Sequence, residues 1–177
     1  AHQQDDIAET MLMRLARGSG TGGLAAPRPV QEFAAGRVHL RPLLTVAKAE
    51  LVAALRAAGA TWREDASNAS PRYFRNRIRG VVLPAWADAA GRDAVAGAAL
   101  SRERLEEDEV ALEAWVVEVA PFTSPGRCLV VGRLAGKPVA LWRRALHRWL
   151  LAVRAETDLS RAGFEQLLAA VRRGRDT

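Results

Sequence analysis

The sequence predicts a short mixed α/β segment followed by a mainly helical one, with the change near residue 84. One strand-like run, residues 38–44, lies between helix-like patterns in the first part, whereas nearly every later pattern is helical. The 177 residues suffice for one ordinary domain or two small ones. A hydrophobic content of 49% with 26% charged residues is typical of a globular chain. We therefore expect two domains, residues 1–84 and 85–177.

The first predicted element is a helix that begins at the Asp5-Asp6 pair. Its apolar residues recur at helical spacing: Ile7, Met11, Leu12 and Leu15. Carboxylates at a helix start cap free N–H groups and complement the helix dipole, which accounts for one of the two aspartates but not for both. Four glycines between residues 18 and 23 predict the end of this helix.

The rest of the first segment alternates between short elements. After the prolines at 27 and 29, residues 38–44 predict a strand, with Pro42 at its end or at a sheet edge. Thr45 is a suitable N-cap for a helix over 46–58, and residues 62–68 predict a loop. A further helix is predicted over 72–83, ended by Pro84.

The second segment predicts three helices, over residues 93–119, 138–154 and 161–173, and a hint of a strand over 129–131. Trp142 and Trp149 are seven residues apart, which favours a place in the core. The less favoured alternative to a core position is that these rings, interleaved with the basic residues around His147, bind nucleic acid.

Charge and cysteine content narrow the class of protein. The net charge of +6 and a pI near 10.8 suggest a polyanionic partner. The charge is segregated, since residues 72–79 hold four arginines and no acid, whereas residues 102–118 hold seven acids and two arginines. A single cysteine, Cys128, excludes an internal disulfide and fits a reducing compartment. No apolar run approaches the roughly 20 residues that span a bilayer, so we expect a soluble cytoplasmic protein.

The acidic start of the first helix is the main candidate for chemistry. Asp5 and Asp6, with Glu9 one turn further on, can hold a divalent cation, orient an ammonium group or act as a base. His2 can bind an anion or shuttle a proton. An ordinary polar helix start explains the same pattern equally well.

Two further motifs point to phosphate. The turn Arg17-Gly18-Ser19-Gly20 can present backbone N–H groups to a phosphate, although such turns are common and this one lacks the pattern of a nucleotide-binding loop. The arginine segment contains Arg72, Arg75, Asn76, Arg77 and Arg79. Guanidinium groups suit phosphates, but pairing with the upstream acids Glu64 and Asp65 is an equal alternative.

Four blocks in order resemble the tRNA(Ile)-lysidine synthetases. They are the run from Ala1 to Thr10, the run from Arg17 to Leu24, Arg41-Pro-Leu-Leu44, and Trp62-x-Glu-Asp-x-Ser-Asn68 followed by Tyr73-x-Arg-Asn-Arg-Ile-Arg79 with Leu83-Pro84. The resemblance implies that residues 1–84 are the C-terminal portion of a PP-loop ATP-pyrophosphatase domain with a parallel sheet. It implies that residues 85–177 form a helical tRNA-binding domain.

The resemblance also implies a reaction. The family adenylates C2 of the wobble cytidine of tRNA(Ile) with a CAU anticodon, and the ε-amine of L-lysine then displaces AMP to give lysidine. ATP and Mg²⁺ are the implied cofactors. Asp5, Asp6 and Glu9 are the implied catalytic residues, and His2, Arg17, Gly18, Ser19 and Gly20 the implied cofactor contacts. The arginine segment is expected to contact tRNA, and a homodimer is a further expectation.

The sequence departs from the family in two places. Gln3 stands where most members have a second histidine, and the Ser-Gly-Gly-x-Asp-Ser loop that grips ATP does not occur in the 177 residues. We therefore expect a piece of a longer synthetase that is inactive alone or depends on the missing part. A non-catalytic tRNA- or RNA-binding module is the main alternative. A tRNA-thiolating relative is disfavoured by the lone Cys128, and a protein-interaction domain has only the acidic stretch in its favour.

Overall fold

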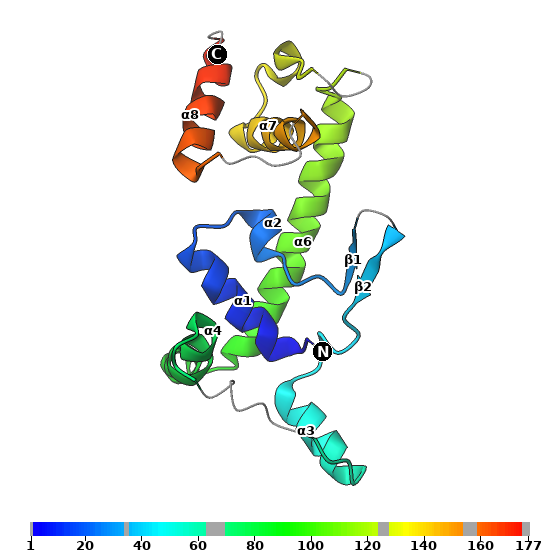
Figure 1. Ribbon diagram of the computed structural model, residues 1–177, viewed down its shortest axis with the longest axis vertical. Coiled ribbons are helices and arrows are strands. Elements are labelled where there is room, and N and C mark those ends of the chain that lie inside the picture. The colour runs from blue at the N-terminus through cyan, green and yellow to red at the C-terminus, as the bar shows by residue number, and fades with distance from the viewer. Residues whose placement is uncertain (1, 34–35, 63–69, 124–127, 154–158, 175–177) are drawn as a thin grey trace. The chain divides into compact units, whose positions relative to one another are not determined.

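The computed structural model describes residues 2–33, 36–62, 70–123, 128–153 and 159–174. The chain divides into two compact units, residues 1–109 and 110–177, and the division falls within the long helix α6 (Ala94–Val119). Packing thus groups the start of α6 with the first unit, so the predicted domain boundary at residue 84 stays a prediction. Figure 1 shows the order of the elements.

The first unit is built around α1 (Gln4–Ala16), which begins close to the predicted position. Ile7, Ala8 and Met11 are buried on one face of α1, as their helical spacing predicts. They pack in two apolar clusters with Leu44 and with alanines of α6. The acidic side chains at the start of α1 are therefore carried by a helix whose opposite face is fixed in the core.

The segment after α1 contains elements that the sequence did not predict. A four-residue helix, α2 (Thr21–Leu24), follows the glycine turn. An antiparallel pair then forms between β1 (Val30–Glu32) and β2 (Val38–Leu40), with Gln31 opposite His39. The predicted strand over 38–44 is therefore shorter, and its partner was missed because Pro29 directly precedes it. In the described residues the strands form this antiparallel pair alone, so the expected parallel sheet stays a prediction.

Helix α3 (Lys48–Ala57) begins two residues later than predicted. Its N-cap is Ala47 and not Thr45, because the Glu50 side chain reaches back and accepts the Ala47 N–H at 3.1 Å. No residue of α3 is fully buried. Most of this helix therefore faces solvent.

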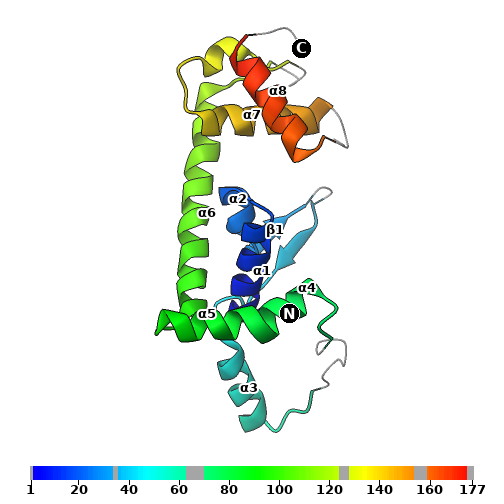
Figure 2. The same ribbon diagram turned by 90° about the vertical axis from the view of Figure 1, so that its left-hand side faces the viewer.

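The prediction that Pro84 ends a helix is wrong. Three helical segments follow one another from Phe74 to Ala90: α4 (Phe74–Arg77), the π-helical turn η3 (Ile78–Val82) and α5 (Leu83–Ala90) (Figure 2). The Leu83 N–H donates to the Ile78 carbonyl five residues back, which is the hydrogen bond of a π-helix. The π-helical turn therefore ends just before Pro84, which has no backbone N–H to donate. Gly91, with a φ of 58°, ends α5 instead.

The second unit packs the end of α6 with α7 (Val139–Val153), α8 (Arg161–Arg172) and the short 3-10 helix η4 (Val131–Leu134). Trp142 is buried in this core and Trp149 packs against it, which confirms the prediction for both rings. The predicted strand at 129–131 is reduced to one bridge between Phe122 and Leu129, because Val131 already begins η4. Among the described residues, no helix has the length and apolar character needed to cross a membrane.

Candidate active site at the start of α1

Two acids of α1 and two arginines of the α4–η3 segment form a closed ionic network. Glu9 accepts hydrogen bonds from Arg75 Nε at 2.6 Å and from Arg79 Nε at 2.5 Å. Asp6 accepts one from Arg75 Nη2 at 2.7 Å. Both arginines come from a segment almost seventy residues further along the chain. The structure therefore joins predicted catalytic acids to predicted tRNA contacts.

Glu9 is the most enclosed member of this network. Its side chain is 1% exposed, whereas those of Arg75 and Arg79 are 37% and 35% exposed. A buried carboxylate persists only when it is paired and hydrogen-bonded, which the two guanidinium groups achieve here. The hydrogen bond to Glu9 raises the pKa of Arg79 above its already high usual range. The network is thus a fixed, charge-balanced wall.

Asp6 has a second role as a helix cap. Its Oδ2 accepts the Gln3 backbone N–H at 2.9 Å, and Gln3 is the N-cap of α1. The capping role expected for one of the two aspartates therefore belongs to Asp6.

Asp5 differs from the other two acids. Its Oδ2 accepts the backbone N–H of Lys48, the first residue of α3, at 2.9 Å. In the part of the chain that the structure describes, no guanidinium or ammonium group pairs with Asp5. This carboxylate is half-buried.

A pocket of about 270 Å³ lies beside Asp5. One part of its lining is polar or charged, and the other part consists of apolar residues from the α5 and α6 segments. The polar part comprises Gln3, Asp5, Glu9, Lys48 and Arg79, and the apolar part comprises Leu83, Pro84, Ala87 and Val95. The site therefore combines an unpaired carboxylate with an aliphatic wall.

His2 lies next to the acids at the start of the chain. Burial lowers the pKa of this imidazole below its ordinary value of 6.5, and the positive charge of Arg41 lowers it further. Asp6 acts in the opposite direction but does not prevail. His2 is therefore neutral at pH 7 and can accept a proton or a hydrogen bond.

The glycine turn lies at the other end of α1. Roughly 20 Å of helix separates it from the acids, at 1.5 Å per residue. The Gly18 N–H bonds the Leu15 carbonyl and the Ser19 N–H bonds the Arg14 carbonyl, so these two donors are already used within the turn. Of the five expected ATP contacts, only His2 lies beside the acids, whereas Arg17, Gly18, Ser19 and Gly20 belong to this distant turn.

The other residues of the arginine segment are bonded locally. Arg77 donates to the carbonyls of Pro71 and Arg72, each at 2.9 Å, and Asn76 donates to the Ser70 carbonyl at 2.9 Å. Arg72 precedes α4 and is exposed. Arg75 and Arg79 pair with Asp6 and Glu9, so the predicted pairing with Glu64 and Asp65 stays a prediction. Glu64 and Asp65 lie outside the described residues, as does most of the predicted loop over 62–68.

Sequence reasoning missed Lys48 and Arg41 as residues of this site. Lys48 lies 43 residues from Asp5, and no local pattern connects the two. Arg41 could have been suspected, because it opens one of the four blocks. Among the described residues, no three His, Cys, Asp or Glu side chains gather in a way that could hold a metal ion.

The comparisons with known proteins agree with one another. Residues 1–86 match the family model of a PP-loop domain. The chain is 38% identical over 172 residues to a tRNA(Ile)-lysidine synthase of Geobacter sulfurreducens, covering 94% of the chain and 35% of that relative. Its identity to the synthase of Mycolicibacterium paratuberculosis is 35% over 173 residues, covering 97% of the chain and 52% of the relative. An Azoarcus synthase is 54% identical over 86 residues, which cover 47% of the chain and 19% of the relative. The chain thus spans about half or less of the length of these relatives.

Proposed function

We propose, since the chain belongs to the family of PP-loop tRNA(Ile)-lysidine synthases, that it takes part in ATP-dependent ligation of lysine to a transfer RNA. The acceptor is C2 of the wobble cytidine of tRNA(Ile) with a CAU anticodon, and the product is lysidine. ATP, used with Mg²⁺, activates C2 by adenylation of its oxygen. The protein acts in the cytoplasm.

One observation carries this proposal, namely the pocket beside Asp5. A lysine side chain consists of an apolar stem and a cationic end, and the pocket offers an aliphatic wall next to a carboxylate. Leu83, Pro84 and Ala87 would contact the stem, while Asp5 would attract the ammonium group. Since Glu9 and Asp6 are already paired with arginines, Asp5 is the acid of the three that remains available to bind an ammonium group.

The three acids therefore receive different roles. Asp5 orients the lysine ε-ammonium group and takes the proton that it must lose before its nitrogen can attack C2. Asp6 and Glu9 are positioning residues, because they bind Arg75 and Arg79, and Arg79 lines the pocket. His2, neutral at pH 7, can take the proton onward.

The guanidinium groups of the α4–η3 segment contribute the tRNA contacts. Arg75 and Arg79 are each about one-third exposed and can meet a phosphate while remaining bonded to the acids. Arg72, Arg77 and Asn76 extend this surface toward solvent. Phosphate contacts of this kind make the affinity salt-dependent.

Transfer of labelled lysine to unmodified CAU-anticodon tRNA with ATP and Mg²⁺ tests the proposal. The chain is assayed beside a version extended upstream to include the Ser-Gly-Gly-x-Asp-Ser loop. We expect the extended protein to incorporate lysine and Asp5→Asn to lower the rate by about 100-fold, because the proton acceptor is removed. The affinity of this variant for tRNA should stay within about two-fold of that of the unsubstituted protein, a tolerance that corresponds to about 0.4 kcal/mol.

Asp88→Asn is the matched control, because Asp88 is an exposed acid on α5 outside the pocket. Equal rates for Asp5→Asn and the control would remove Asp5 from catalysis. A non-catalytic tRNA-binding module is the alternative function, favoured by the net charge of +6. Salt-sensitive tRNA binding without lysine incorporation by the extended protein would establish that alternative.

A further inference from the structure

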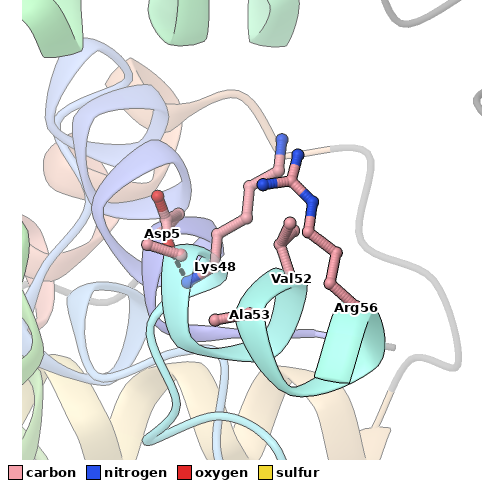
Figure 3. A pocket seen from close by; sticks show the side chains of 6 residues that line it. Asp5, Lys48, Val52, Ala53 and Arg56 are labelled. Atoms are coloured by element: carbon pink, nitrogen blue, oxygen red, sulfur yellow. Dashed lines mark hydrogen bonds between the residues drawn. The ribbon is translucent and has the colours of Figure 1, made fainter. Parts of the chain in front are cut away.

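The exposed face of α3 carries a basic surface next to the site. Lys48, Val52 and Arg56 follow one another at intervals of four residues and so share one side of the helix. Figure 3 shows the side chains of Lys48 and Arg56 extending from α3 on the same side. Together with Asp5, Ala49 and Ala53 these residues line a pocket of about 450 Å³. We call this pocket the α3 face.

Neither cation of the α3 face is neutralised within the described part of the chain. Lys48 and Arg56 have no ion pair there, and their side chains donate no hydrogen bond. The acid of α3, Glu50, is turned back to cap the helix at Ala47. Asp5 accepts the backbone N–H of Lys48 and forms no salt bridge with its ammonium group. The α3 face therefore presents two unpaired cations against one carboxylate, that of Asp5, and so has a net positive charge.

The shape of the α3 face suits an extended anion. Ala49 and Ala53 are among its lining residues and carry single methyl groups, so they leave room for a group of phosphate size. The flanking residues are exposed, which leaves the pocket accessible to a long polymer. A guanidinium fork and an ammonium group are the usual protein ligands of phosphate oxygens.

We propose that the α3 face binds the phosphodiester backbone of the RNA substrate. This inference rests on the proposed function, and it adds Lys48 and Arg56 to the RNA contacts. Lys48 lines both the α3 face and the pocket beside Asp5. A phosphate held by Lys48 therefore brings the neighbouring nucleotide to the carboxylate that receives the lysine.

The test compares two double variants that lose the same charge. Lys48→Gln with Arg56→Gln removes both cations of the α3 face, whereas Arg92→Gln with Arg104→Gln removes two exposed arginines of the same unit outside the pocket. Binding of unmodified CAU-anticodon tRNA is measured for the chain between 50 and 200 mM salt, ranges typical for such assays. Circular dichroism melts verify that both variants fold.

We expect the α3 variant to bind tRNA about ten-fold more weakly and to reduce the slope of log affinity against log salt by about 1.5, since two phosphate contacts are lost. The control should keep a slope close to that of the unsubstituted chain. Equal slopes for both variants, with tRNA binding by the chain and lysine transfer by the upstream-extended protein both intact, would overturn this inference alone. Failure of the unsubstituted chain to bind tRNA would overturn the proposed function with it.

A parallel titration with ATP separates the two sources of phosphate. In the version extended upstream to include the Ser-Gly-Gly-x-Asp-Ser loop, the two α3 substitutions should leave the affinity for ATP unchanged. Loss of ATP binding with an unchanged tRNA salt slope would assign the α3 face to the nucleotide triphosphate and overturn the RNA assignment.

Discussion

The two ends of α1 are held in opposite ways. At its N-terminal end, the side chains bond to residues 43 to 70 positions away in sequence, through Lys48, Arg75 and Arg79. At its C-terminal end, Gly18 and Ser19 bond to carbonyls of the preceding turn. The first end depends on the tertiary structure, whereas at the second end the backbone donors of Gly18 and Ser19 are satisfied within the helix and its turn.

This difference separates two kinds of polar motif that look alike in sequence. Both the acidic run and the glycine turn consist of residues that are rare in cores. The glycine turn uses its donors to end a helix, whereas the acidic run leaves Asp5 with an unpaired charge beside a pocket. Only the long-range contacts distinguish the two cases.

The largest expected effect on stability comes from breaking the ionic network at the N-terminal end of α1. Glu9→Gln removes the charge that binds Arg75 and Arg79 and leaves both guanidinium groups with Asp6 alone. We expect the free energy of unfolding to fall by about 2–3 kcal/mol, the low end for a broken buried pair, because solvent screens the partly exposed arginines. A urea titration followed by tryptophan fluorescence measures this change.

Glu107→Gln serves as its control, since Glu107 is an exposed acid on α6. This variant should stay within about 0.5 kcal/mol of the unsubstituted chain. If Glu9→Gln unfolded at the same urea concentration as the control, the network would not stabilise the fold.

A smaller effect is expected at the C-terminal end. Gly18 has a φ of 68°, a conformation that side chains with a Cβ adopt at a cost of about 1–2 kcal/mol. Gly18→Ala should therefore lower the free energy of unfolding by about 1 kcal/mol. Gly20→Ala is the matched change, since Gly20 has a φ of −80° and an added Cβ meets nothing within 4 Å. Equal melting temperatures for the two variants would show that the turn does not need its glycine at 18.

The smallest expected effect is a change in the pKa of His2. Its pKa should lie below 6.5 in an NMR titration, and Arg41→Gln should raise that pKa because a nearby positive charge is lost. Arg41→Lys keeps the charge and should leave the pKa of His2 low. An identical His2 titration in both variants would exclude the electrostatic effect of Arg41.

The same shift has a consequence for stability. The unfolded chain takes up a proton at His2 near pH 6.5, whereas the folded chain does so only at lower pH, where its depressed pKa lies. The free energy of unfolding therefore falls as the pH drops from 6.5 to the pKa of folded His2. Below that pKa, this contribution becomes constant.

Periodicity was sufficient to predict the helices that bury one face. The apolar spacing in α1 predicted the burial of Ile7 and Met11, and the spacing of Trp142 and Trp149 predicted the core of the second unit. The acids at the start of α1 were also recognised as a site from sequence. Residue type and order carry these features, because they depend on neighbours within a few turns.

Features that depend on distant partners could not be predicted in this way. Nothing near Asp6 or Glu9 indicates that Arg75 and Arg79 bind them, and nothing near Asp5 indicates Lys48. Likewise, the hairpin partner of β2 follows two prolines, and the helix around Pro84 continues through a π-helical turn. In each case the tertiary structure overrides the local signal.

The π-helical turn also makes the pocket sensitive to the number of residues in the chain. Five residues, Ile78–Val82, occupy a turn that a regular helix fills with fewer. Every side chain after this turn is consequently rotated by about 100° relative to an uninterrupted α-helix. Leu83, Pro84 and Ala87 then line the pocket beside Asp5. A deletion of one residue here would rotate the aliphatic wall away from Asp5 while leaving the composition of the helix almost unchanged.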